Sequence, residues 1–216
     1  MIRTFTFSQP GGHPINEDAF TLCRLCHDPD GWVACLADGQ GGRAGGGQAA
    51  QLACRKIEEM AALATPKSLC KSSFWTDALA RADRAIVDSQ SAGFTTLIGL
   101  VVANDRATGA SCGDSSVIAV QGSGSVTELT ARQFKNPPVG SGEACFVPFE
   151  IKLTKPWRLL AMSDGVWKYA GWPRVWELAV QLSGERLLVE LQNSARLRGT
   201  GQFHDDFTVV LIEASD

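Results

Sequence analysis

A run of mostly apolar residues at positions 32–37 stops at an aspartate, Asp38, and is followed at once by glycine. The run is too short for a helix and glycine ends it, so it predicts a buried β-strand with Asp38 at its end. A second run, residues 159–163, stops in the same way at Asp164 and Gly165. Each of these strands therefore places one carboxylate at its carboxyl end.

Two further segments carry the acid before the strand. Glu17 and Asp18 precede the strand-like residues 19–22, and Asp205 precedes the apolar run that starts at Phe207. In an antiparallel sheet, the end of one strand lies at the same edge as the start of its neighbour. The four segments therefore predict one cluster of carboxylates at that edge. Its members are Asp18, Asp38, Asp164 and Asp205.

Such a cluster needs positive charge to persist. Neighbouring carboxylates raise one another's pKa, so they remain ionised only where cations neutralise them. Oxygen ligands without an obvious set of histidines or cysteines suit Mg²⁺ or Mn²⁺ better than zinc or copper. A pair of such ions can hold a phosphate group and activate a water molecule. The pattern thus predicts metal-assisted hydrolysis of a phosphoester.

Length and charge narrow the class of protein further. The chain has 216 residues, 44% of them hydrophobic, which fits a single domain over residues 1–216 with a sizeable core. Its formal net charge of -3 argues against nucleic acid or an anionic membrane as a partner. We expect a cytoplasmic monomer, because no signal peptide or apolar run of about 20 residues is found. The seven cysteines, with Cys23 and Cys26 in a CxxC pair, are expected to be reduced thiols.

The order of predicted elements indicates an α+β protein. Helical periodicity covers residues 44–64 and 75–86, with Thr65-Pro66 between them, and recurs over residues 173–182 and 185–198. Strands are predicted at residues 95–102, 126–129 and 146–153 and from Phe207 onwards, and a further pair of strands is predicted around Gly113-Asp114. Residues 136–142 are predicted to form a loop. Strands in runs with paired helices favour a layered sandwich. Neither a P-loop nor a dinucleotide-binding fingerprint is present.

Six short motifs, in this order, resemble those of the metal-dependent type 2C protein serine/threonine phosphatases, the PPM family. They are Asn16-Glu17-Asp18-Ala19, Ala37-Asp38-Gly39-Gln40-Gly41-Gly42, Phe94-Thr95-Thr96, Gly113-Asp114-Ser115, Met162-Ser163-Asp164-Gly165-Val166-Trp167 and Asp205-Asp206-Phe207-Thr208. Each motif alone is weak, since an Asp-Gly turn is common. Together they extend over nearly the whole chain and are similar to those of compact bacterial members.

The resemblance implies an αββα sandwich of two antiparallel β-sheets flanked by helix pairs, with two Mn²⁺ or Mg²⁺ ions at one edge. It implies that Asp38 bridges both ions, that the Gly39 carbonyl joins the second, and that a water between the ions is the nucleophile. Asp164 and Asp205 would complete the site of the first ion. The remaining ligands implied are Glu17 and Asp18 near the second ion, directly or through water, and Asp114 at a third, weaker ion. The implied partner is a phosphoprotein, whose kinase the enzyme would oppose.

The residues that face substrate in this family differ here. His13 stands where many members carry an arginine that holds the substrate phosphate, and a histidine is mostly neutral at pH 7. One hypothesis is that His13 contacts phosphate only when protonated; the alternative is an ordinary surface histidine. Arg43 or Lys168 could supply the missing charge. Gln40 cannot protonate a leaving group, and Ser116 replaces a frequent arginine.

Three other functions stay open on the sequence. A phosphoesterase acting on small molecules would use the same chemistry. A pseudophosphatase would bind a partner without turnover, which the altered His13 and Gln40 favour and the retained aspartates disfavour. A structural ion such as Ca²⁺ would use the carboxylates as a clip between segments, and its removal would unfold the protein.

Overall fold

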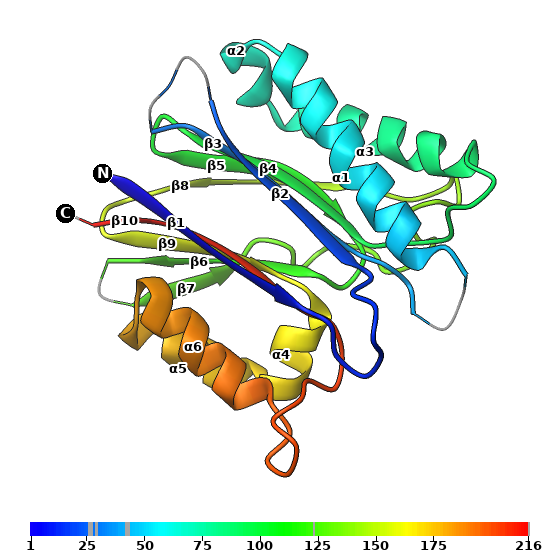
Figure 1. Ribbon diagram of the computed structural model, residues 1–216. Helices are drawn as coiled ribbons and strands as arrows, with labels where there is room; N and C mark the ends of the chain where they lie inside the picture. The colour runs from blue at the N-terminus through cyan, green and yellow to red at the C-terminus, as the bar shows by residue number, and fades with distance from the viewer. Residues whose placement is uncertain (26–27, 29, 42–43, 123, 216) are drawn as a thin grey trace.

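The computed structural model describes the chain except for residues 26–27, 29, 42–43, 123 and 216. Two five-stranded antiparallel sheets are stacked face to face (Figure 1). The first has the order β1 (Ile2–Gln9), β10 (Phe207–Ala214), β9 (Trp157–Met162), β6 (Ser116–Gln121) and β7 (Ser125–Glu128). The second has the order β2 (Asp18–Arg24), β3 (Trp32–Asp38), β4 (Leu97–Ala103), β5 (Arg106–Cys112) and β8 (Val147–Lys152).

Helices cover the outer face of each sheet (Figure 1). Over the second sheet lie α1 (Gly46–Leu63) and α3 (Ser72–Val87), joined by the short α2 (Pro66–Leu69). Over the first sheet lie α4 (Asp164–Ala170), α5 (Trp172–Gln181) and α6 (Gly184–Ala195). The predicted αββα sandwich of class α+β is therefore confirmed. Among the described residues no helix is long and apolar enough to cross a membrane.

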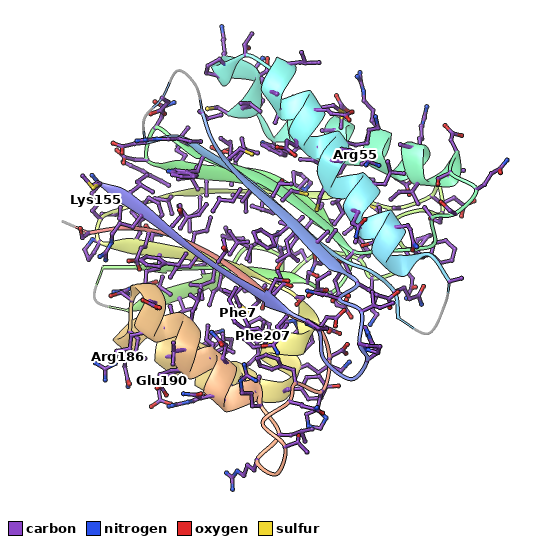
Figure 2. All side chains as sticks on the ribbon, in the orientation of Figure 1. Phe7, Arg55, Lys155, Arg186, Glu190 and Phe207 are labelled. Carbon is purple, nitrogen blue, oxygen red and sulfur yellow. The ribbon has the colours of Figure 1, made fainter. Side chains whose placement is uncertain are left out.

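The layering explains why the strands read as continuous apolar runs. In β3, Val33 and Cys35 pack toward α1 and α3, whereas Ala34 and Leu36 pack between the two sheets. Because successive side chains of a strand point to opposite faces, a strand covered on both sides needs apolar residues at every position. On the outer side of the first sheet, Phe7 and Phe207 meet edge to face, with ring centroids 5.8 Å apart, beneath α6 (Figure 2).

Several predicted boundaries were wrong. Residues 164–170 form α4, for which the sequence predicted no element, because a seven-residue helix is too short for a periodic pattern. The strand expected from residue 95 begins at Leu97, and the helix expected to reach residue 198 ends at Ala195. The strands on either side of Gly113-Asp114 are β5 and β6, which belong to different sheets. Cys26 lies outside the described residues; the other six cysteines are free thiols.

Candidate active site

The pairing of β2 with β3 sets the centre of the site. Asp18 lies directly opposite Asp38 in the antiparallel register, so two carboxylates of like charge face each other at the end of the strand pair. Asp18 is 9% exposed, and neither of its carboxylate oxygens accepts a hydrogen bond of regular geometry, although the Thr208 and Ser163 hydroxyls lie nearby. Burial raises the pKa of Asp18 from 3.8 to about 7; nearby hydroxyls of Thr208 and Ser163 oppose this rise, and negative charges on Asp206 and Asp164 add to it.

Backbone contacts hold Asp38 in place without using its carboxylate. Its N–H donates to Thr96 Oγ1 at 2.9 Å, and its carbonyl accepts from Thr95 Oγ1 at 2.8 Å and from the Thr96 N–H at 2.8 Å. Burial is the largest cause that raises the pKa of Asp38 well above its usual value, and the charges of Asp18 and Asp164 raise it further.

Gly39 is required by close packing at the turn after β3. A Cβ atom at this position would lie 2.5 Å from the carbonyl carbon of Gly46 and 2.7 Å from the carbonyl oxygen of Glu17. The Gly39 N–H also donates to that Glu17 oxygen at 3.2 Å. A side chain here would therefore separate β3 from both the start of α1 and the segment that leads into β2.

The junction of β9 with β10 brings Asp164 and Asp205 to the same edge. Ser163 accepts from the Thr208 N–H at 3.0 Å through its hydroxyl and donates its own N–H to the Thr208 carbonyl at 3.0 Å. A Cβ at Gly165 would lie 2.0 Å from the Asp206 carbonyl oxygen, so α4 can start this close to β10 only with glycine. Burial raises the pKa of Asp164.

Asp206 has a structural role. Its carboxylate accepts from the Gly11 N–H at 2.9 Å and from the Glu17 N–H at 2.5 Å, and it is 5% exposed. His13 Nε2 lies 3.8 Å from Asp206 Oδ1. Asp206 therefore ties the segment between β1 and β2, which carries His13, to the start of β10.

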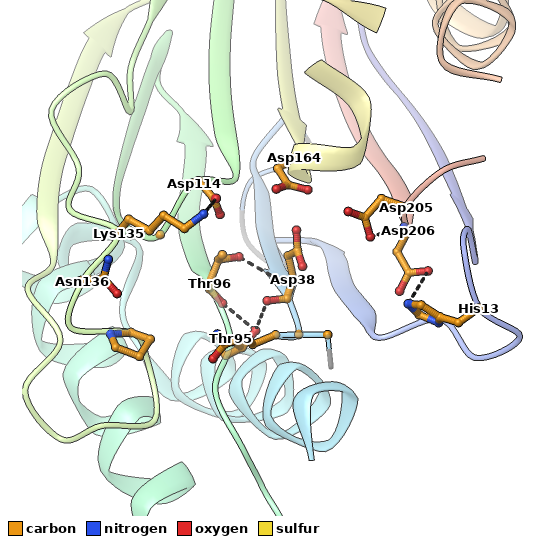
Figure 3. A pocket seen from close by; sticks show the side chains of 15 residues that line it. His13, Asp38, Thr95, Thr96, Asp114, Lys135, Asn136, Asp164, Asp205 and Asp206 are labelled. Carbon is orange, nitrogen blue, oxygen red and sulfur yellow. Dashed lines mark hydrogen bonds and ion pairs between the residues drawn. The ribbon is translucent and has the colours of Figure 1, made fainter. Parts of the chain in front are cut away.

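These elements enclose a pocket of about 370 Å³ at the end of the sandwich opposite the chain termini (Figures 1 and 3). Aspartates from four segments of the chain line it together with one histidine and one lysine. These residues are His13, Asp38, Asp114, Lys135, Asp164, Asp205 and Asp206. Of the acidic residues singled out in the sequence, Asp38, Asp114, Asp164 and Asp205 line this pocket. Asp18 is buried opposite Asp38 in the strand register and does not line it.

Not every candidate residue lies in this pocket. Glu17 lines a separate depression beside α1 that shares His13 with the pocket. Glu17 precedes β2, which begins at Asp18, and its backbone is held by Asp206 and Gly39. Ser116 is buried on β6, 3.1 Å from Thr130 Oγ1. Gln40 lines the pocket, whereas Gly42 and Arg43 lie outside the described residues.

Two lysine side chains near the aspartates come from segments for which the sequence pattern predicted no helix or strand. Lys168 on α4 lies 3.4 Å from Asp164 Oδ2 and 4.0 Å from Asp205 Oδ2. Lys135, in the loop between β7 and β8, forms an ion pair with Asp114. The sequence pattern gives no sign of Lys135, because a single loop lysine carries no periodicity or motif. His204 stacks on Tyr169, with ring centroids 4.5 Å apart.

The donor set fits a hard divalent cation. In the described part of the chain no three Asp, Glu, His or Cys side chains already converge as a finished metal site. The oxygens of Asp18 nevertheless lack partners of regular geometry, and the negative charge of Asp164 raises the pKa of both Asp18 and Asp38. Buried carboxylates without partners are costly unless a cation compensates them. Oxygen donors of this kind match magnesium or manganese.

The antiparallel αββα sandwich and its acidic pocket define a phosphatase of the PPM type. The model of the family "Stage II sporulation protein E (SpoIIE)" matches residues 28–215, and the chain belongs to this family. No curated protein matches the sequence. The family assignment confirms the resemblance to PPM phosphatases that the motifs indicated.

Solved structures of bacterial phosphatases share the fold. A bacterial serine phosphatase is 17% identical with a TM-score of 0.81, covering 100% of this chain and 99% of its own. The serine/threonine phosphatase Stp1 from Staphylococcus aureus is 16% identical with a TM-score of 0.80, covering 100% and 96%. RsbX, solved in complex with magnesium, is 16% identical with a TM-score of 0.74, covering 99% and 96%.

Proposed function

We propose that the protein removes phosphate from serine or threonine side chains of a partner protein, in a reaction that depends on two Mg²⁺ or Mn²⁺ ions. The observation that carries the proposal is the register of β2 against β3, which sets Asp18 opposite Asp38 at the edge that Asp164 and Asp205 also reach. Family membership and the similarity in fold to bacterial serine/threonine phosphatases support this substrate class.

The ligands follow from the resemblance and from the placement of the side chains. Asp38 and the Gly39 carbonyl, with Asp164 and Asp205, would hold the ions, with Asp18 behind Asp38. Glu17 would act only through water, since it lines the neighbouring depression. Asp114 is the candidate for a third, weaker ion, in competition with Lys135. When bound, the ions supply positive charge for the phosphate group and lower the pKa of a water molecule.

The chain's own residues contribute positioning. Thr95 and Thr96 fix the backbone of Asp38, so its carboxylate remains available to an ion. Asp206 fixes the segment that carries His13 at the pocket wall.

We further propose that the enzyme acts as a cytoplasmic monomer that opposes a serine/threonine kinase, in keeping with an acidic, cysteine-containing chain of one domain.

The test is hydrolysis of an aryl phosphate and of phosphoserine and phosphothreonine peptides, with Mn²⁺, with Mg²⁺ and with a chelator. We expect turnover only with metal, and loss of about 100-fold or more in kcat for Asp38→Asn and Asp164→Ala, because each removes charge from an ion that stabilises the transition state. Asp77→Asn, at an exposed position on α3 outside the pocket, is the matched control and should keep full activity.

Other outcomes would select the alternatives. Binding of Mn²⁺ without turnover of any substrate would favour a pseudophosphatase. Rapid turnover of small phosphate esters beside slow turnover of phosphopeptides would favour a small-molecule phosphoesterase. Unfolding by the chelator, without activity in any metal, would indicate a structural ion.

A further inference from the structure

The charge of the pocket raises the question of what binds the phosphate group of the substrate. Five aspartates line it, so without bound ions a phosphate dianion meets a strongly negative wall. Among the described residues, the basic side chains in this wall are His13 and Lys135. A histidine is mostly neutral at pH 7, whereas a lysine keeps its charge. Lys135 is therefore the permanent cation of the described pocket wall.

The position of Lys135 suits a contact with substrate. Its ammonium group pairs with Asp114, and its side chain is 68% exposed, whereas that of Asp114 is 21% exposed (Figure 3). An exposed lysine is protonated at neutral pH, so the group is charged. Lys168 differs, because it faces Asp164 and Asp205 from α4 and does not line the pocket.

Hydrogen bonds fix the loop of Lys135 on its amino-terminal side. The Phe134 carbonyl accepts from the Gly113 N–H at 2.8 Å and from the Cys112 thiol at 3.3 Å. Gly113 directly precedes Asp114, so the same short stretch positions both members of the ion pair. The lysine thus starts from a fixed backbone, which reduces the entropy lost when it contacts a ligand.

The other side of the loop is tied down as well. The Val139 carbonyl accepts from the Thr95 N–H at 3.0 Å, next to the residues that hold Asp38. Further along, the buried carboxylate of Asp83 on α3 accepts from the N–H groups of Gly140 at 2.5 Å and Gly142 at 3.3 Å. Gly140 has φ +102°, a conformation that favours glycine. Anchors on both sides therefore hold Lys135 at the pocket wall.

We propose that Lys135 binds the phosphate group of the substrate and so replaces the arginine that many PPM phosphatases carry at the position of His13; this inference rests on the proposed function. The ammonium group has three donors, so it can keep its contact with Asp114 and donate to a phosphate oxygen at the same time. Asp114 is then a positioning residue for Lys135. A contact of this kind binds substrate and transition state equally, so it acts on KM and leaves kcat nearly unchanged.

The experiment compares the wild type with Lys135→Gln, Lys135→Arg and the control Lys155→Gln. Lys155 lies at the opposite end of the sandwich, near the amino terminus (Figure 2). The assay uses an aryl phosphate at the lowest Mn²⁺ concentration that gives full turnover, so that a weaker third ion does not displace Lys135 from Asp114. Under these conditions we expect Lys135→Gln to raise KM about tenfold, and to raise the inhibition constant of inorganic phosphate equally, as for a lost charged hydrogen bond. Lys135→Arg should stay within about threefold, because it keeps the charge, and Lys155→Gln should match the wild type.

An unchanged KM and unchanged phosphate inhibition in Lys135→Gln would overturn the proposal, as would an equal effect of Lys155→Gln. A wild type without any turnover would instead refute the proposed function. In that case calorimetry with inorganic phosphate in MgCl₂ still tests Lys135. Binding to the wild type that is about tenfold weaker in Lys135→Gln supports the role, and equal binding, or no binding to the wild type, overturns it.

Discussion

Replacing Asp18 by asparagine should stabilise the metal-free protein at pH 8, although it removes a residue of the site. Asp18 is buried opposite Asp38, and its oxygens have no hydrogen-bond partner of regular geometry. At pH 8 the wild type must therefore keep a buried, unpaired charge next to a second carboxylate. Asparagine has nearly the same size and no charge, so the substitution removes that cost.

The magnitude follows from the pKa of Asp18, which is raised from 3.8 to about 7 in the folded protein. At about 1.4 kcal/mol per pH unit, this corresponds to about 4 kcal/mol of destabilisation when the group is ionised. The buried amide of asparagine lacks a partner, which costs about 1–3 kcal/mol. We therefore expect a net gain of about 1–3 kcal/mol in the free energy of unfolding at pH 8.

The pH dependence has a defined sign. The folded protein binds the Asp18 proton more tightly than the unfolded chain, so stability is highest below pH 3.8 for this group and falls as the pH rises toward about 7. At pH 5 the folded wild type keeps the proton, so the advantage of Asp18→Asn should shrink or reverse there. Only above about pH 7 is the full difference present.

The assay is urea unfolding in a chelator at pH 5 and pH 8, followed by the same measurement in MgCl₂. Mg²⁺ should stabilise the wild type by binding the folded state, and stabilise Asp18→Asn less. Asp77→Asn is the control for a lost aspartate at an exposed position. The reasoning is refuted if Asp18→Asn is less stable than the wild type in chelator at pH 8, or if its effect is the same at both pH values.

Three further variants test other contacts of the site. Lys168→Gln removes an ammonium group 3.4 Å from Asp164 and 4.0 Å from Asp205. Calorimetry should therefore show Mn²⁺ binding about three- to tenfold tighter than in the wild type. Unchanged binding would exclude competition between this lysine and the metal. Asp206→Asn weakens two backbone hydrogen bonds and should lower the free energy of unfolding by about 1–3 kcal/mol, measured in urea. His13→Arg should lower KM at pH 8, and an unchanged or raised KM would contradict a phosphate contact at this position.

The sequence predicted the acidic cluster because strand register is set by the core. The apolar residues of β3 alternate between two packed layers, so a shift by one residue would move every one of them to the wrong side. With β2 and β3 in that register, Asp18 and Asp38 must meet at the end. Glu17 lies before the start of β2, so the register does not fix its side chain, which lines a neighbouring depression.

Features set by tertiary hydrogen bonds were beyond the sequence pattern. The seven residues of α4 start at an Asp-Gly pair that equally suits a turn, and the contact of Gly165 with the Asp206 carbonyl is what selects the helix start. Lys135 reaches the pocket only because its loop is bonded to Gly113 and Thr95, residues far from it in the chain. Periodicity and composition carry no record of such contacts.

This difference between strand ends and loops suggests how the phosphate-binding cation can change position. The proposed metal ligands at the strand ends cannot move without breaking the register of the sheets, but His13 and Lys135 come from separate loops that line one pocket. Arginine at position 13 should therefore substitute for the lysine. In the Lys135→Gln background, we expect His13→Arg to return KM to within about threefold of the wild-type value. In the wild-type background, we expect His13→Arg to change KM less, because Lys135 already supplies the positive charge. A double variant as impaired as Lys135→Gln alone would show that the two positions do not reach the same phosphate group.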